Sequence, residues 1–145
     1  MRVLPPMIDP AVLSEAPSRP KGRRPWGDKF GDACRGLKLG IRGHSSFFVH
    51  FFFAALVVAA ALVFRCDLLE WCVLLGCIGL VLTAELVNSA IETLYHGLDD
   101  VAKLRTKPCL DIAAGAVLLA SITAIVIGGL VFLNRLGAMV TSWQQ

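Results

Sequence analysis

Three polar side chains recur within a strongly apolar stretch of the chain: Glu85, Asn88 and Glu92. At about 100° per residue of an α-helix they fall within about 60° of arc, so they share one face. A carboxylate in the middle of a membrane-spanning helix costs about 2.5–3.5 kcal/mol on insertion scales, and such residues are usually functional. Carboxylate and amide oxygens suit Mg²⁺, which commonly binds one or two carboxylates together with substrate phosphates. This polar stripe therefore predicts a site for a metal and a phosphate.

Two other interpretations of the stripe stay open at this point. Glu85 and Asn88 are also suited to hydrogen bonding between helices of an oligomer, with Glu92 solvated at the membrane edge. A small ion-conducting or transport subunit would carry buried carboxylates as well. Spacing alone does not separate these interpretations from a catalytic site.

The elements that must carry the stripe are long and apolar. Of the 145 residues, 56% are hydrophobic and 17% charged, which is too apolar for an ordinary soluble domain of this size. Three stretches are long enough to cross about 30 Å of hydrocarbon as helices. We expect these spans at residues 47–64, 69–95 and 109–133. The predicted fold class is therefore an all-α membrane protein.

Local signals mark the expected helix ends. Thr106 and Pro108 favour a helix start, because a hydroxyl can cap free amides and proline is tolerated in the first turn. The polar segment 97–108 is thus expected to be a loop, and residues 138–145 a short tail. The second span is expected to continue past the membrane surface to about Tyr95 or Gly97.

The region before the first span has two parts. Residues 1–28 hold six of the seven prolines with scattered charge, a composition that predicts a disordered basic tail. No continuous apolar stretch of the kind found in cleavable signal peptides is visible there. Over residues 30–43 apolar residues recur at helical spacing beside basic ones, which predicts an amphipathic helix in the membrane interface. A plain extension of the first span is the alternative.

Basic residues are distributed unevenly between the connections. Nine of the fourteen Lys and Arg precede the first span and three lie between the second and third, whereas the first connection and the segment after the third span carry one each. The positive-inside rule then predicts a cytoplasmic N-terminus and a C-terminus outside. The five cysteines show no zinc-type spacing and are expected to be small apolar residues. No nucleic-acid partner is predicted.

The run ELVNSAIE at residues 85–92 resembles the signature of small prokaryotic membrane kinases, the diacylglycerol kinase and undecaprenol kinase family. The run DIAAGAVL at residues 111–118 resembles the family's second motif, and the resemblance covers about residues 30–133. It implies a homotrimer in the bacterial inner membrane that transfers the γ-phosphate of ATP to a lipid hydroxyl, with Mg²⁺ as cofactor. Consistently, the chain has no GxxxxGK[ST] sequence typical of P-loop enzymes.

The resemblance also implies roles for single residues. It makes Glu85 the base that activates the lipid hydroxyl and Glu92 a metal ligand. Asn88 and Asp111 are implied to support nucleotide binding in the same site. Phosphoryl transfer depends on positioning and charge neutralisation more than on covalent catalysis, so this set of residues is chemically sufficient.

At three positions the chain differs from the family pattern, and one of them is His96, where many members have an aspartate. His44 stands where the family has a metal-binding glutamate, and it is the candidate metal ligand there. Leu110 stands where the family has a lysine, and Lys107 is the candidate replacement at the phosphates, with Lys103 and Arg105 as alternatives.

The prediction is therefore an ATP- and Mg²⁺-dependent lipid kinase acting on diacylglycerol or undecaprenol. The alternative is a kinase-derived membrane scaffold or lipid- or nucleotide-binding protein without turnover, suggested by His44 and Leu110.

Overall fold

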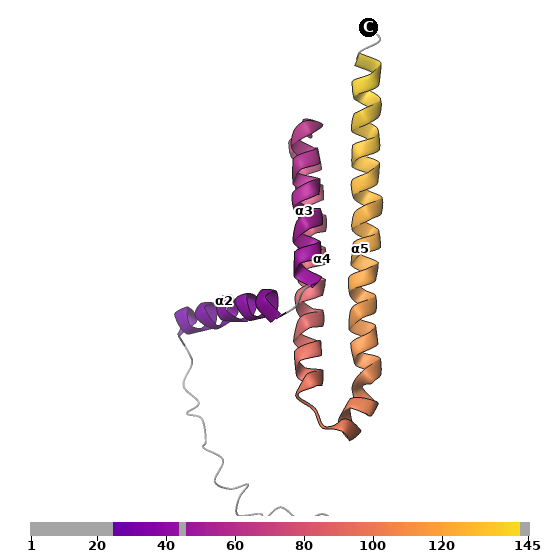
Figure 1. Ribbon diagram of the computed structural model, residues 1–145. Coiled ribbons are helices and arrows are strands. Elements are labelled where there is room, and N and C mark those ends of the chain that lie inside the picture. Colours follow the sequence, from indigo (N-terminus) through magenta and orange to yellow (C-terminus); the bar gives the residue numbers. More distant parts are fainter. Residues whose placement is uncertain (1–24, 44–45, 143–145) are drawn as a thin grey trace, which may run out of the picture.

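A computed structural model describes residues 25–43 and 46–142. Within these residues the chain is all helical and forms four helices (Figure 1). These are α2 (Trp26–Gly43), α3 (Ser46–Val63), α4 (Leu68–His96) and α5 (Asp100–Ser142). Helices α3, α4 and α5 are each long and apolar enough to cross a membrane, so the predicted all-α fold with three candidate spans is confirmed. His44 and residues 1–24 of the expected tail lie outside the described residues.

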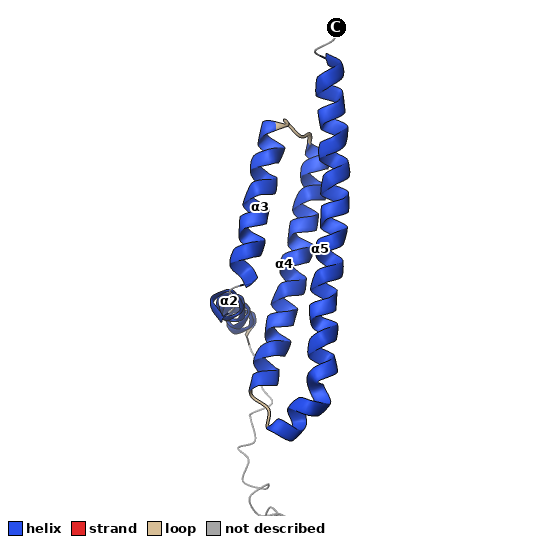
Figure 2. Ribbon diagram, turned by 45° about the vertical axis from the view of Figure 1, so that its right-hand side comes forward, coloured by secondary structure: helices blue, strands red, loops and turns tan. Residues whose placement is uncertain are grey.

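The three long helices run side by side, and α2 lies across them (Figures 1 and 2). α4 packs along α5 as an antiparallel pair, whereas α3 has a smaller contact with α4. α2 also contacts α4. α4 continues past the level of α2, so its last turns and the first turns of α5 lie beyond α2 (Figure 1).

The outer surface of this bundle is apolar. Among the described residues the buried apolar side chains are few: Phe47, Ala61, Leu74, Ala113 and Ala120. Most large apolar side chains of α3, α4 and α5 are exposed instead. Such a surface is far larger than the apolar patches of soluble monomers. Lipid chains or neighbouring helices must therefore cover it, and the helical backbone satisfies its own polar groups in that environment.

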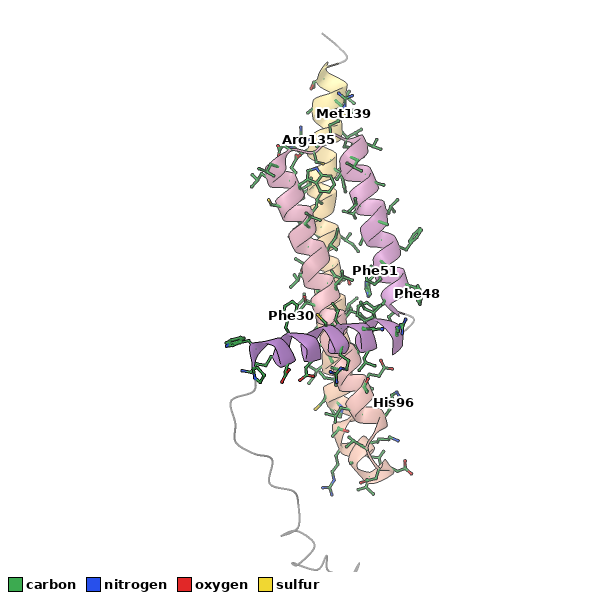
Figure 3. All side chains as sticks on the ribbon, turned by 90° about the vertical axis from the view of Figure 1, so that its left-hand side faces the viewer. Phe30, Phe48, Phe51, His96, Arg135 and Met139 are labelled. Carbon is green, nitrogen blue, oxygen red and sulfur yellow. The ribbon has the colours of Figure 1, made fainter. Side chains whose placement is uncertain are left out.

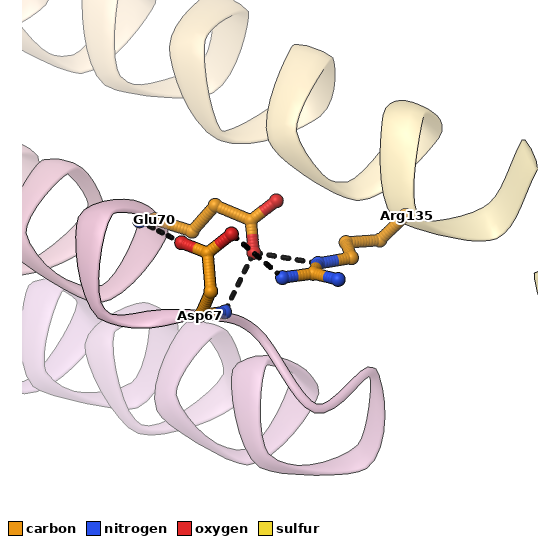
Figure 4. A network of polar contacts seen from close by, with 3 residues as sticks. All are labelled: Asp67, Glu70 and Arg135. Carbon is orange, nitrogen blue, oxygen red and sulfur yellow. Dashed lines mark hydrogen bonds and ion pairs between the residues drawn. The ribbon is translucent and has the colours of Figure 1, made fainter. Parts of the chain in front are cut away.

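The start of α4 is tied to α5 by a network of charged groups. Asp67 and Glu70 form a capping box, in which the Asp67 amide donates to Glu70 Oε2 at 2.8 Å and the Glu70 amide donates to Asp67 Oδ1 at 3.0 Å. Arg135 of α5 then donates from Nε to Glu70 Oε2 at 2.6 Å and from Nη2 to Asp67 Oδ2 at 2.9 Å (Figure 4). The Phe64 and Phe132 rings, 5.7 Å apart, close the same end of the bundle.

α5 begins earlier than the sequence suggested. Its first turn is capped by Asp99, whose Oδ1 accepts from the Ala102 amide at 2.9 Å, and Thr106 lies inside the helix with its hydroxyl donating to the Ala102 carbonyl at 2.8 Å. The expected start at Thr106 and Pro108 is therefore wrong, because the carboxylate of Asp99 already caps the free amides upstream. The connection between α4 and α5 shrinks to residues 97–99.

Pro108 is consequently an interior residue of α5. Proline has no amide hydrogen and its ring crowds the preceding turn, so it bends a helix rather than continuing it straight. The first turns of α5 are inclined to the rest of the helix (Figure 1). At its other end α5 runs to Ser142, so most of the expected tail at 138–145 is helical.

Candidate active site

Glu85 is buried between helices. Only 3% of the residue is exposed, although α4 presents most of its apolar side chains outward. Its nearest basic group comes from α3: Nε2 of His50 lies 3.7 Å from Oε2 of Glu85, with the His50 side chain 20% exposed. Within residues 25–43 and 46–142, His50 is the one basic side chain at ion-pair distance from Glu85. The buried carboxylate thus has a single ionisable neighbour on another helix.

Helix α2 crosses α4 next to this carboxylate. A Cβ atom added to Gly40 would fall within overlap distance of the Leu86 side chain, so glycine permits the close crossing. Phe47, at the start of α3, is also buried, at 2% exposure. Phe30 points from α2 to the side of the long spans, whereas His96 lies beyond α2 on the opposite side (Figure 3). The buried carboxylate therefore lies close to the level at which α2 crosses.

Two further polar atoms of α4 are buried without a hydrogen-bond partner in the described part of the chain: Oδ1 of Asn88, which belongs to the stripe, and Oγ of the neighbouring Ser89. Ser89 is 1% exposed. Asn88 lines a shallow apolar groove between α4 and α5, together with Cys109 and Ala113 among others. A buried acceptor without a partner costs about 1–3 kcal/mol, so it calls for a donor or a cation from outside the chain. Two side chains of the stripe therefore face different helices: Glu85 lies near α3, whereas Asn88 faces α5.

Glu92 lies near the end of α4 and is much more accessible. Its side chain is 36% exposed, and its Oε1 is 3.7 Å from Nε2 of His96 one turn later. Because α4 and α5 are antiparallel, Glu92 lies level with the first turns of α5, which carry Lys103 and Lys107. Asp111 is exposed and lies deeper along α5. The polar stripe thus runs from a buried carboxylate to an accessible one beside basic residues.

Because α5 starts early, Lys103 and Lys107 lie in the same helix as Asp111 and on nearby parts of its surface. Lys103, Lys107 and Asp111 follow at intervals of four within one helix, so successive members are about 40° apart. Arg105 is about 160° away from Lys107 around the helix. Of the candidates for the missing lysine, Lys107 is therefore the nearest to Asp111 on the helix surface. Leu110 itself is half-buried and apolar.

The donor atoms on α4 fit a magnesium ion that arrives with a nucleotide. Within the described residues no three His, Cys, Asp or Glu side chains cluster closely enough to hold a metal. Mg²⁺ needs no such cage, since it keeps waters and uses one or two carboxylates plus phosphates. The Glu92 carboxylate and the partnerless amide oxygen of Asn88 are oxygen donors of the required kind. His44 is outside the described residues, so its part in this set stays a prediction.

His50 is the residue that the sequence did not single out for the site. From the sequence alone, His50 at the start of the first span is expected to be an interface or packing residue. Its meeting with Glu85 depends on how α3 packs against α4, and no spacing within either helix reveals that contact. The available signal is chemical, because ionisable groups inside membrane spans usually pair with one another.

Comparisons with known proteins give the chain its family. A family model described as prokaryotic diacylglycerol kinase matches residues 31–132. The chain is 33% identical over 112 residues to a diacylglycerol kinase of Synechocystis, covering 72% of this chain and 60% of that protein. It is 31% identical over 107 residues to an undecaprenol kinase of Bacillus subtilis, covering 74% and 87% of the two chains. No solved structure matches the chain significantly.

The chain therefore spans about 60% of the Synechocystis relative and most of the Bacillus one. The matched segment contains α3, α4 and most of α5, including the polar stripe and the basic start of α5. A match of this extent, with two relatives above 30% identity, establishes that the chain belongs to the prokaryotic diacylglycerol kinase family.

Proposed function

We propose that the chain is a lipid kinase that transfers the γ-phosphate of ATP to the hydroxyl of a membrane lipid, diacylglycerol or undecaprenol, at the cytoplasmic interface. The observation that carries this proposal is the burial of Glu85, 3% exposed, beside His50 close to where α2 crosses the bundle. A carboxylate held there is costly for the fold and in reach of a lipid head group. The names of both relatives support this reaction class.

In this mechanism Glu85 is the general base. Its carboxylate accepts the proton of the lipid hydroxyl while the hydroxyl oxygen forms a bond to the γ-phosphorus of ATP, and ADP leaves with the electrons of the broken P–O bond. Proton transfer by a positioned side chain typically contributes about 10²–10⁴-fold to such a rate. The scarcity of water around a 3% exposed residue also disfavours hydrolysis of ATP.

The nucleotide would be held at the accessible end of the stripe. Glu92 and Asn88 would hold Mg²⁺, with His44 as a further candidate ligand, and Asp111 and Lys107 would orient the phosphates. Mg²⁺ would supply charge neutralisation at the transferred phosphoryl group. The support is that the Glu92 side chain is 36% exposed and that, within the described residues, Asn88 has a buried oxygen without a partner.

The hydrocarbon part of the acceptor has a place beside the base. A cavity of about 470 Å³ lies between α3, α4 and α5, and it is lined almost wholly by apolar side chains, among them Phe53, Leu74 and Phe132. His50 also lines it. An acyl or prenyl chain in this cavity would leave its hydroxyl at the polar end, next to Glu85. Apolar contacts of this kind favour a lipid alcohol over a soluble one.

Two further parts of the proposal concern the setting of the site. The excess of basic residues before α3 and at the start of α5 supports a cytoplasmic N-terminus in the inner membrane, with α2 in the interface and the C-terminus outside. The large apolar surface of the single chain and the partnerless Asn88 oxygen support assembly into a homotrimer. A neighbouring subunit would cover both.

The test is a phosphorylation assay with purified protein in mixed micelles, radiolabelled ATP and Mg²⁺, and a panel of diacylglycerol, undecaprenol and other lipid alcohols. We expect label in at least one lipid and a fall of about 100-fold or more in kcat for Glu85→Gln, which keeps the size of the side chain but not its basicity. The absence of labelled lipid throughout the panel would contradict the proposal. ATP binding without any transfer would instead support the non-catalytic scaffold, for which the apolar Leu110 is the structural argument.

A further inference from the structure

His50 has no assigned part in the reaction above, yet it is the ionisable neighbour of the proposed base. The two side chains come from different helices, α3 and α4, which otherwise share a limited contact. His50 Nε2 lies 3.7 Å from the carboxylate oxygen Oε2 of Glu85. Ring and carboxylate are both shielded, at 20% and 4% side-chain exposure. A polar contact in such surroundings is stronger than the same contact in water.

We propose that His50 is a positioning residue for Glu85, which binds Oε2 and thereby turns Oε1 toward the lipid hydroxyl. This inference rests on the proposed function, in which Glu85 is the base. A free carboxylate on a flexible glutamate side chain samples several rotamers, whereas a carboxylate held at one oxygen presents the other in a single direction. The distance of 3.7 Å is too long for a hydrogen bond, and such contacts often shorten when the substrate is bound.

The location of His50 ties this orientation to the acceptor. The imidazole also lines the apolar cavity between α3, α4 and α5, where it is the only basic side chain of the lining. A lipid chain in the cavity therefore touches the residue that holds the base. In the reaction the hydroxyl proton passes to Oε1, the O–P bond to the γ-phosphorus forms, and the bond from that phosphorus to the bridging oxygen of ADP breaks. His50 keeps Oε2 throughout and exchanges no proton with the substrate.

Among the described residues of the neighbouring helices, no other basic group is within ion-pair distance of Glu85. α5 carries no charged side chain between Asp111 and Arg135, and Arg135 is engaged with Asp67 and Glu70 at the far end of α4. Within the described part of α2, no lysine or arginine is at ion-pair distance from Glu85. The orientation of the carboxylate in the described structure thus depends on His50.

The experiment compares three substitutions of His50 in the kinase assay with the wild type. His50→Gln keeps an N–H donor of similar reach, whereas His50→Phe and His50→Met fill the space without a donor. We expect kcat to fall about tenfold or more for Phe and Met and to stay within about threefold for Gln, with KM for ATP changed less than about twofold in all three. Phe52→Leu, on an outward-facing position of α3 that is 66% exposed, is the control for a packing change.

A double-mutant cycle separates positioning from packing. In a Glu85→Asp background the carboxylate is one methylene shorter and no longer meets His50, so His50→Phe should then reduce kcat by less than about twofold further. Additive losses would overturn the inference and indicate a packing role. The assembled size and thermal midpoint of each variant are measured in parallel. If His50→Phe does not assemble, the kcat of His50→Met is compared with that of His50→Gln to test the positioning role.

The outcomes also distinguish the two proposals. A wild-type protein without transfer to any lipid overturns the proposed function, and the inference with it. An active wild type with unchanged kcat for His50→Phe and His50→Met overturns the role of His50 alone. Equal losses for Gln, Met and Phe would overturn it as well, because the retained donor should rescue the rate.

Discussion

At the scale of single residues, the stripe on α4 combines three environments within two helical turns. Glu85 is buried beside His50, Asn88 faces α5 with a partnerless oxygen, and Glu92 is accessible beside His96. These differences follow from which helix covers each side chain. They match the proposed function, in which proton acceptance requires shielding from water and nucleotide binding requires access from solvent.

Lys107 is predicted to contact the phosphates of the nucleotide. It shares a face of α5 with Asp111, whereas Arg105 lies on the other side of the helix. Lys107→Ala should therefore raise KM for ATP about tenfold, because a charge-assisted contact to a phosphate is lost. The measurement is the initial rate against ATP concentration at saturating lipid, with Arg105→Ala as the comparison. A rise for Arg105→Ala that equals or exceeds that for Lys107→Ala would show that the phosphates lie elsewhere.

At the scale of elements, the two ends of the bundle are held by different means. At the end away from α2, Arg135 joins α5 to the capping box of α4, and the ring of Phe64, just after α3, contacts that of Phe132 on α5. At the other end, Gly40 lets α2 cross α4 closely. The network of Arg135, Asp67 and Glu70 therefore stabilises the packing of α4 against α5 at the end away from α2.

Arg135→Ala should consequently lower stability more than activity. The Arg135 side chain is 26% exposed and the Asp67 side chain 61% exposed, so solvent screens part of the pair, and a modest fall in the thermal midpoint is expected. Thermal unfolding in detergent measures it. Arg135→Lys keeps the charge but not the pair of hydrogen bonds made by the guanidinium group. Its thermal midpoint should therefore fall between those of the wild type and Arg135→Ala. If the thermal midpoint of Arg135→Ala equals that of the wild type, the contacts of Arg135 with Asp67 and Glu70 do not contribute to stability.

At the scale of the whole molecule, the arrangement implies an orientation in the membrane. The connection between α3 and α4 lies at the end of the bundle away from α2, where the positive-inside rule places the outer surface. It contains Cys66, which is half-buried, whereas Cys34 is exposed on α2. The two thiols should therefore be accessible from opposite sides of the membrane.

Labelling with a membrane-impermeant maleimide tests this orientation in spheroplasts that express single-cysteine variants. Cys66 should be labelled in intact spheroplasts, and Cys34 only after permeabilisation. Burial, and then the nearby Glu70 carboxylate, raise the pKa of the Cys66 thiol. Because the thiolate is the reactive form, its labelling at neutral pH should be slow and should accelerate as the pH rises. Labelling of Cys34 from outside with protection of Cys66 would mean the reverse orientation.

The all-helical class of the protein and its polar stripe could be predicted from the amino-acid sequence. Three apolar segments of spanning length and the spacing of Glu85, Asn88 and Glu92 are local properties, which helical periodicity reports directly. The same holds for the family motifs that lie on α4 and α5. The start of α5 was misplaced because two caps competed, and the carboxylate of Asp99 lies upstream of the hydroxyl of Thr106.

The contacts between side chains of different helices could not be predicted in this way. The contact of His50 with Glu85 and that of Arg135 with Asp67 and Glu70 join helices that are distant along the chain. Such contacts depend on how the helices rotate and shift against one another, and inside a membrane many rotations bury similar apolar area. The costly polar groups select among them, because each buried charge gains most where it finds a partner.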